Sequence, residues 1–312
     1  MNMLFLKGKS SWRSLLPLFV GIAAFFVIVG PRSLDPTNIF WLYGGFDPTQ
    51  HYLGWAIFRE GPWAFPIGLN PNFGMEYSNA IVFSDSIPLF AFLFKPFSVW
   101  LPATFQYIGI WTLTCFVLQA WFAWKLVGLI TDSALIRLFS TLIFVFSPPM
   151  MYRIGVHSAL VGHFLILIAL YLIFSSRNKN CLVSWTLLIC TAALVHFYLL
   201  AMVLCLWFAS LLDRTLRKDI HIGALQVIKQ ILIAFVLLLF TMWQAGYFSV
   251  QAGSGSAGGY GIFHLNLFSP IDSRGWSYLL KPIPMEVDDG YSYFGLGGLF
   301  LICCALLSLI HI

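Results

Sequence analysis

The chain has 312 residues, of which 60% are hydrophobic and only 9% are charged. Soluble domains carry about 25% charged residues, so this composition excludes a soluble globular fold and predicts a polytopic membrane protein. The formal net charge of +5 says little about partners, because the placement of charges is what matters, and nothing in the sequence suggests nucleic-acid binding. Nearly all six cysteines fall in hydrophobic runs without a CxxC pair, which favours packing roles over disulfides or a structural metal.

Apolar runs along the chain predict about eight membrane spans. They are 14–30, 103–124, 134–150, 158–175, 182–195, 197–212, 225–246 and 293–312. The first run follows basic residues but lacks a small-x-small cleavage site, so we interpret it as an uncleaved span. The chain ends within or just past the last run, as expected for a shortened form of a longer protein. The predicted fold class is all-α, with a single transmembrane domain over 1–312.

The apolar stretch from Leu182 to Leu212 has two interpretations. As one helix it would measure about 46 Å at roughly 1.5 Å per residue, too long for a hydrocarbon core of about 30 Å. As two helices each would be short. Basic clusters at both ends favour a return to the same side, so we predict two short helices that turn near His196.

The distribution of charge predicts the orientation. With the N-terminus in the cytoplasm, most basic residues fall in short inner loops and most acidic residues fall outside, as the positive-inside rule requires. Two long segments then face outward, 31–102 and about 247–292. The second contains the glycine-rich run 252–261, which lacks the Gly-Lys-Ser/Thr of a P-loop and is interpreted as a linker, with a mobile lid as the alternative.

Asp47 is the first candidate for chemistry, within Gly45-Phe46-Asp47-Pro48-Thr49-Gln50-His51-Tyr52. Asp-Pro-Thr-Gln is typical of a helix start, with Asp at the N-cap and Pro at the first helical position, and this cap explains the residues without a function. The functional alternative is compatible with it. A carboxylate at a helix N-terminus is oriented and stays ionised, as a general base that deprotonates a sugar hydroxyl requires. His51 would lie one turn further on the same face.

The helix after Asp47 is amphipathic and is predicted to lie along the membrane surface until Gly61-Pro62 ends it. A second short apolar helix is predicted to begin at Ser84-Asp85-Ser86-Ile87-Pro88. Asp85 is interpreted either as the N-cap of that helix or as a functional group. In the second case it would support Asp47 or act as an oxygen ligand for a divalent cation beside it.

Further candidates lie in the later outer turns. Arg153 is interpreted as a contact for a phosphate or for lipid headgroups, and His157 as a structural or a substrate-binding histidine. His157 and His163 are six residues apart and so do not share one metal-binding helix face. His196, at the predicted turn, is a polar residue in an apolar run. Candidates for a charged headgroup are His264, Asn266, Asp272, Arg274, Trp276, Lys281 and Tyr291, with Arg274 and Lys281 as the anion contacts.

Several functional classes find no support in the sequence. No acidic or basic residue lies clearly in the middle of a predicted span, where ion-coupled transporters usually need one. The sequence contains no HExxH, GxSxG or Walker motif.

At Gly45-Phe46-Asp47-Pro48-Thr49-Gln50-His51 the chain resembles the GT-C superfamily of multi-pass glycosyltransferases. The shared pattern is a first span, an outer acidic motif, two surface helices in the first long loop and a Pro-rich outer turn at Ser147-Pro148-Pro149. More narrowly, the chain is similar to a family of uncharacterised bacterial membrane proteins of that architecture. The motifs that carry this similarity are Gly68-Leu69-Asn70-Pro71-Asn72-Phe73-Gly74, Phe83-Ser84-Asp85-Ser86-Ile87-Pro88 and Tyr291-Ser292-Tyr293-Phe294-Gly295-Leu296-Gly297.

The resemblance implies a bacterial inner-membrane enzyme that transfers a sugar from a polyprenyl-phosphate donor at the outer face, with Asp47 as general base. Basic outer residues would hold the donor phosphate. Many members pair adjacent acids in this loop, whereas Pro48 follows Asp47 here, so a second acid would have to be Asp85. The alternatives are a non-catalytic protein that transports or handles lipid-linked glycans, and a structural membrane subunit. The sequence does not specify whether a divalent cation is needed, which sugar is transferred, or which protein partners bind.

Overall fold

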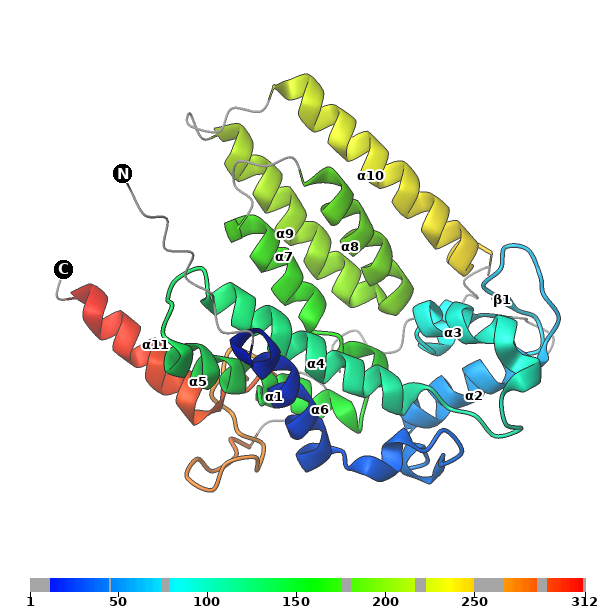
Figure 1. Ribbon diagram of the computed structural model, residues 1–312, viewed down its shortest axis with the longest axis horizontal. Helices are drawn as coiled ribbons and strands as arrows, with labels where there is room; N and C mark the ends of the chain where they lie inside the picture. Colours follow the sequence, from blue (N-terminus) through cyan, green and yellow to red (C-terminus); the bar gives the residue numbers. More distant parts are fainter. Residues whose placement is uncertain are drawn as a thin grey trace, which may run out of the picture.

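A computed structural model describes residues 12–44, 46–74, 79–175, 181–216, 223–249, 266–284 and 291–310 (Figure 1). The longer helices are α1 (Trp12–Ile28), α2 (Phe46–Glu60), α4 (Ile108–Val127), α5 (Ala134–Val145), α7 (Phe164–Ser175), α8 (Leu182–Val195), α9 (Phe197–Leu216), α10 (Ala224–Ala245) and α11 (Gly295–Ile310). The shorter elements are η1 (Pro31–Leu34), η2 (Phe40–Leu42), β1 (Leu69–Asn70), β2 (Asn79–Ala80), η4 (Ile81–Ser84), α3 (Pro88–Phe94), η5 (Lys95–Trp100), α6 (Pro148–Ile154) and η6 (Ser158–Val161). The described chain is therefore helical, with one antiparallel two-stranded ribbon.

Each of the eight apolar runs contains a helix, but not every helix is long enough to cross a membrane alone. Within the described ranges, four segments are long and apolar enough: Ile108–Val127, Ser158–Ser175, Phe197–Leu216 and Ala224–Ala245. A fifth is obtained if α5 and α6, which meet at a 44° bend, form one broken span. By length and hydropathy, the described helices therefore provide four or five candidate spans, fewer than the eight predicted.

Helix α4 is the centre of the helical bundle. It packs against α1, α5 and α7, while α8 packs against α9 and α10 (Figure 1). Close approach of α1 to α4 depends on Gly21, because a Cβ there would lie 2.7 Å from the backbone of Phe116. The outward side of α10 carries exposed apolar side chains such as Leu225, Ile228 and Leu232. A water-facing helix would not present so apolar a face, so this side suits contact with lipid.

The break at His196 is confirmed. Helix α8 ends at Val195 and α9 begins at Phe197, because His196 adopts an extended backbone conformation with φ −165° and ψ 141°. The two helices pack against each other and run side by side in Figure 1. His196 and the first residues of α9 therefore lie at the turn between the two helices.

The first long loop forms a compact layer across one end of the bundle, made of α2, the β1–β2 ribbon, η4 and α3 (Figure 1). Helix α2 ends at Glu60, next to the predicted Gly61-Pro62 stop. Part of its apolar side packs inside the protein: Trp55 and Phe58 are fully buried, and the Trp55 indole N–H donates to the Phe105 carbonyl at 3.0 Å. This side of α2 is therefore fixed to the protein core.

The ribbon ties this layer to α10. The N–H of Gly68 donates to the Gln244 carbonyl at 2.8 Å, and a Cβ on Gly68 would lie 2.2 Å from the Ala245 carbonyl oxygen. Gly246 then ends α10 with φ +91°, in the left-handed conformation that favours glycine at a helix C-terminus. After this turn, the Tyr247 ring packs near that of Phe83 in the layer, and its hydroxyl donates to the Ala193 carbonyl of α8 at 2.8 Å.

Candidate functional site

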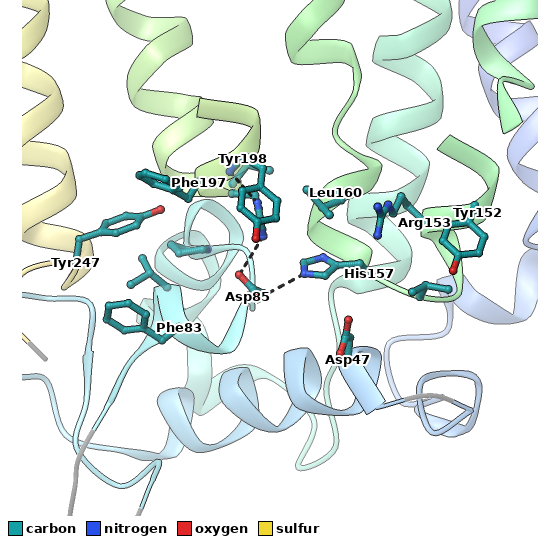
Figure 2. Close-up of a pocket in the computed structure, with 15 residues that line it drawn as sticks. Asp47, Phe83, Asp85, Tyr152, Arg153, His157, Leu160, Phe197, Tyr198 and Tyr247 are labelled. Carbon is teal, nitrogen blue, oxygen red and sulfur yellow. Dashed lines mark hydrogen bonds and ion pairs between the residues drawn. The ribbon is translucent and has the colours of Figure 1, made fainter. Parts of the chain in front are cut away.

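A pocket of about 800 Å³ lies between the loop layer and the end of the helical bundle (Figure 2). It is lined by Asp47, Val82, Phe83, Asp85, Pro88, Tyr152, Arg153, Val156, His157, Leu160, Val195, His196, Phe197, Tyr198 and Tyr247. Its size lies within the range of about 300–1,000 Å³ that small-molecule sites occupy. Its wall combines aromatic rings with two carboxylates, one guanidinium and two imidazoles.

The pocket is lined by residues from segments that are far apart in the sequence. Its lining comes from the first loop, from α6 and the turn after it, from the α8–α9 turn and from the end of α10. These are the segments that the charge distribution predicts on a single side of the membrane. The structure therefore brings Asp47, Asp85, Arg153 and His157 round one cavity.

Asp47 lies in the first turn of α2 rather than at the predicted N-cap, because the helix begins at Phe46. Among the described residues, no hydrogen bond or ion pair to its carboxylate is found, so the capping bond to the backbone that the sequence predicts is absent. Figure 2 shows the side chain pointing from α2 toward the part of the pocket that holds His157 and Arg153. The carboxylate thus faces the cavity while the positive end of the helix dipole lies beside it.

Asp85 sits in a strained and tightly packed connection between η4 and α3. Its φ is +50°, a left-handed conformation uncommon for residues other than glycine. The N-cap of α3 is Ile87, so the interpretation of Asp85 as that cap is wrong. The hydroxyl of Ser86 donates to the His51 carbonyl at 2.6 Å, and the Tyr107 hydroxyl donates to the Ser86 carbonyl. Such supporting bonds are what hold a strained backbone in place.

Close packing of α2 on this connection requires Gly54. A Cβ there would lie 2.1 Å from the Ser84 hydroxyl oxygen and 2.4 Å from that of Ser86. The two serine hydroxyls lie 2.8 Å apart in a hydrogen bond of their own. The position of Asp85 is therefore set by contacts between two parts of the first loop.

Two histidines contact the Asp85 carboxylate from opposite segments. His157 Nε2 lies 3.5 Å from Oδ2, and His196 Nε2 lies 3.4 Å from Oδ1. The N–H of Tyr198 donates to His196 Nδ1 at 3.0 Å. Because Nδ1 accepts that bond, the proton of a neutral His196 ring is on Nε2 and points to Asp85.

Burial and neighbouring charges set the ionisation of this group. Burial raises the pKa of the Asp85 carboxyl, but the hydrogen bond from His157 and the charge of His196 oppose it, and the net pKa is below its usual value. Burial, together with the charge of His157, lowers the pKa of His51 to about 3. Burial also lowers the pKa of His196 to about 4. At neutral pH the group holds an ionised Asp85 beside neutral His51 and His196 rings.

His51 lies behind the pocket wall rather than in it. It is 1% exposed, and its ring packs against that of His157 with centroids 4.7 Å apart. The ligand atoms of His51, Asp85 and His157 all lie within 4.8 Å of one another, which makes these the residues able to hold a metal ion. His51 is thus placed to act through its neighbours rather than by touching a substrate directly.

The late loop contributes less to the pocket than expected. Arg274 and Lys281 lie in the 266–284 segment, outside the residues that line the cavity, and Arg274 pairs with Asp272 at 3.9 Å. The loop approaches the site through Trp276, whose ring packs near those of Tyr152 and Tyr291. His264 and the glycine-rich run lie outside the described residues. Arg153 remains the predicted anion contact that lines the pocket.

Sequence reasoning did not identify the partners of Asp85 or the aromatic wall. His196 was recognisable as a polar residue in an apolar run, and that was the available signal. Tyr198 and Tyr247 carry no local pattern, because their roles arise from the α8–α9 turn and the glycine that ends α10. The contact between His51 and His157 likewise arises only in the folded chain.

The comparisons with known proteins give one family. The family described as a domain of unknown function, DUF6311, matches residues 18–311. No curated protein and no solved structure matches the chain. Because the match covers almost its whole length, the chain belongs to the DUF6311 family.

Proposed function

We propose that this protein is a glycosyltransferase that moves a sugar from a polyprenyl-phosphate donor to an acceptor at the outer face of the membrane. The observation that carries the proposal is the single pocket lined by Asp47, Asp85 and Arg153, a base, a second acid and an anion contact. The resemblance of the first loop to GT-C glycosyltransferases gives the reaction class. The apolar helices around the pocket are suited to a donor with an isoprenoid chain.

Asp47 acts as the general base. Its carboxylate faces the pocket and has no hydrogen-bond partner among the described residues, so it is available to the acceptor hydroxyl. The carboxylate takes the hydroxyl proton as the acceptor oxygen forms a bond to the anomeric carbon. The bond from that carbon to the phosphate oxygen breaks, and the polyprenyl phosphate leaves with the electron pair. General base catalysis of this kind contributes about 10²–10⁴ in rate.

Arg153 binds the phosphate of the donor. Its guanidinium lies 5.6 Å from the Tyr152 ring, which holds the side chain along the pocket wall. Arginine suits this role because its planar fork can donate two parallel hydrogen bonds to phosphate oxygens. The rings of Phe83, Tyr198 and Tyr247 give the opposite wall flat surfaces for the apolar face of a sugar.

The direct test is consumption of donor by purified protein in proteoliposomes. Polyprenyl-phosphate hexoses with a tritiated sugar would be supplied as a panel, and free polyprenyl phosphate and transferred label would be measured. The proposal predicts protein-dependent release of polyprenyl phosphate from at least one donor, with label moved to acceptor or to water. Movement of intact donor between leaflets without cleavage would instead support a transporter and contradict the proposal.

A further inference from the structure

His51, Asp85 and His157 form a candidate metal site among the described residues. Their potential ligand atoms all lie within 4.8 Å of one another, although the residues come from α2, the η4–α3 connection and the α6–η6 connection. Asp85 and His157 line the pocket (Figure 2), and the buried ring of His51 packs against that of His157. Two imidazoles and one carboxylate are a recurrent ligand set for catalytic zinc, with a further position left open.

The distance between Asp85 and His157 is also compatible with two ligands of one ion. Two ligands of a tetrahedral zinc ion, with Zn–N and Zn–O bonds of about 2.1 Å, would lie about 3.4 Å apart. The separation of Asp85 Oδ2 and His157 Nε2 is 3.5 Å, close to that tetrahedral edge.

His196 has a different place in this arrangement. Its Nδ1 accepts the Tyr198 N–H at 3.0 Å, so Nε2 carries the ring proton and has no lone pair to bind a metal. That proton points to Asp85 Oδ1, 3.4 Å away. His196 therefore holds one carboxylate oxygen, which leaves Oδ2 for the ion. Hydrogen-bonded support of a ligating carboxylate is usual in metal sites.

The buried ring of His51 supplies a second observation. Among the described residues, its Nδ1 is buried without a hydrogen-bond partner, and the ring is 1% exposed. Buried polar atoms without partners are rare, and each one calls for an explanation such as an ion. His157 would reach the ion through Nε2, the nitrogen that faces Asp85.

We propose that His51, Asp85 and His157 bind one divalent transition-metal ion, with Zn²⁺ as the preferred ion, on the α2 side of the pocket. The nitrogen-rich ligand set selects against Mg²⁺ and Ca²⁺, which prefer oxygen ligands. The open coordination position takes an oxygen of a phosphate group in the pocket. This last role rests on the proposed function, whereas the binding of the ion does not.

The test measures metal content and binding without any substrate. Protein purified in detergent would be stripped with a chelator, reloaded with Zn²⁺ or Co²⁺, and measured by mass spectrometry and visible absorption. We expect one tightly bound ion per chain, Co²⁺ bands of tetrahedral intensity, and a rise in Tm on addition of Zn²⁺. His51→Asn and His157→Asn should each lose the ion and the rise in Tm, while the matched control His163→Asn should retain both.

His196→Asn separates a supporting role from a ligand role. It should keep the one-to-one stoichiometry but bind Zn²⁺ about 10–100-fold more weakly, as expected when the support of a ligand is removed. A wild-type chain that retains no Zn²⁺, or variants of His51 and His157 that bind it as the wild type does, would overturn the proposal. Zinc binding without donor cleavage would refute only the proposed enzymatic function.

Discussion

The two carboxylates of the pocket belong to regions that hold them in opposite ways. Asp47 projects from the first turn of a regular helix, and no partner for it is found among the described residues. Asp85 sits on a left-handed backbone residue between two histidines and is fixed by serine and tyrosine hydroxyls around it. The two carboxylates are therefore suited to different roles. Asp47, with free lone pairs, can accept a proton, whereas Asp85, which is held on both oxygens, can position a cation.

Asp85→Ala should have the broadest effect, because it removes the group on which two histidines converge. We expect loss of Zn²⁺, loss of donor cleavage and a lower Tm, with a stability cost of about 1–3 kcal/mol for the unpaired neighbours. Glu60→Ala, at an exposed acid of α2, is the matched control. If both variants bind Zn²⁺ and have the same Tm, Asp85 is no more firmly held than an exposed acid, which would contradict the contrast between Asp85 and Asp47.

Gly54→Ala tests whether packing against α2 holds Asp85 in place. Alanine favours a helix over glycine by about 1 kcal/mol, so an unobstructed site would gain stability. Here the new Cβ would meet two serine oxygens, and we expect a net loss of about 1–3 kcal/mol together with weaker Zn²⁺ binding. Thermal unfolding would be compared with Gly297→Ala, where a Cβ meets nothing within 4 Å. Equal or higher stability for Gly54→Ala would argue against this contact.

Arg153→Gln should weaken donor binding more than it lowers the stability of the protein. Loss of a charge-assisted contact to phosphate is worth about 1.5–3 kcal/mol, which corresponds to a rise in KM of roughly 10–100-fold. Steady-state kinetics with the polyprenyl-phosphate donor would show it, with kcat much less changed. An unchanged KM would remove Arg153 from the donor site and leave the pocket without its described anion contact.

Tyr247→Phe should have the smallest effect. Burial raises the pKa of its hydroxyl, which therefore stays protonated and donates to the Ala193 carbonyl at 2.8 Å. Removal of that bond should cost about 0.5–1.5 kcal/mol and leave Zn²⁺ binding intact. Tyr278→Phe, at a fully exposed ring, is the control and should not change Tm. A loss of Zn²⁺ in Tyr247→Phe would show that the aromatic wall and the Asp85 group are coupled.

The helices could be predicted from sequence because hydropathy acts locally. Each apolar run contains a helix, and the length of 182–212 together with the basic clusters at its two ends predicted the break near His196. The number of spans could not be predicted in the same way, since apolar helices such as α8 are too short to cross a membrane unaided. The packing of Trp55 and Phe58 inside the protein could not be predicted, because an amphipathic face is buried in lipid or in protein with the same residue pattern.

The site could be predicted only in part. Asp47, Asp85, Arg153 and His157 were chosen from their places in outer turns, and all four line the pocket. Their pairing was not predictable, because His51 meets His157, and Asp85 meets His196, only through packing between distant segments. The helix-start pattern also placed Asp47 at the N-cap, whereas the helix includes Phe46 and so places Asp47 in its first turn.

The central claim is that Asp47 is the base, and Asp47→Asn tests it most directly. The substitution keeps the size and the helix-start preference of the side chain but removes its basicity. With Glu60→Gln as control, we predict that donor cleavage in proteoliposomes falls by about 10²–10⁴ while Tm and Zn²⁺ content stay at wild-type values. Cleavage at the wild-type rate in Asp47→Asn, or a loss of activity matched by a loss of stability, would contradict the account.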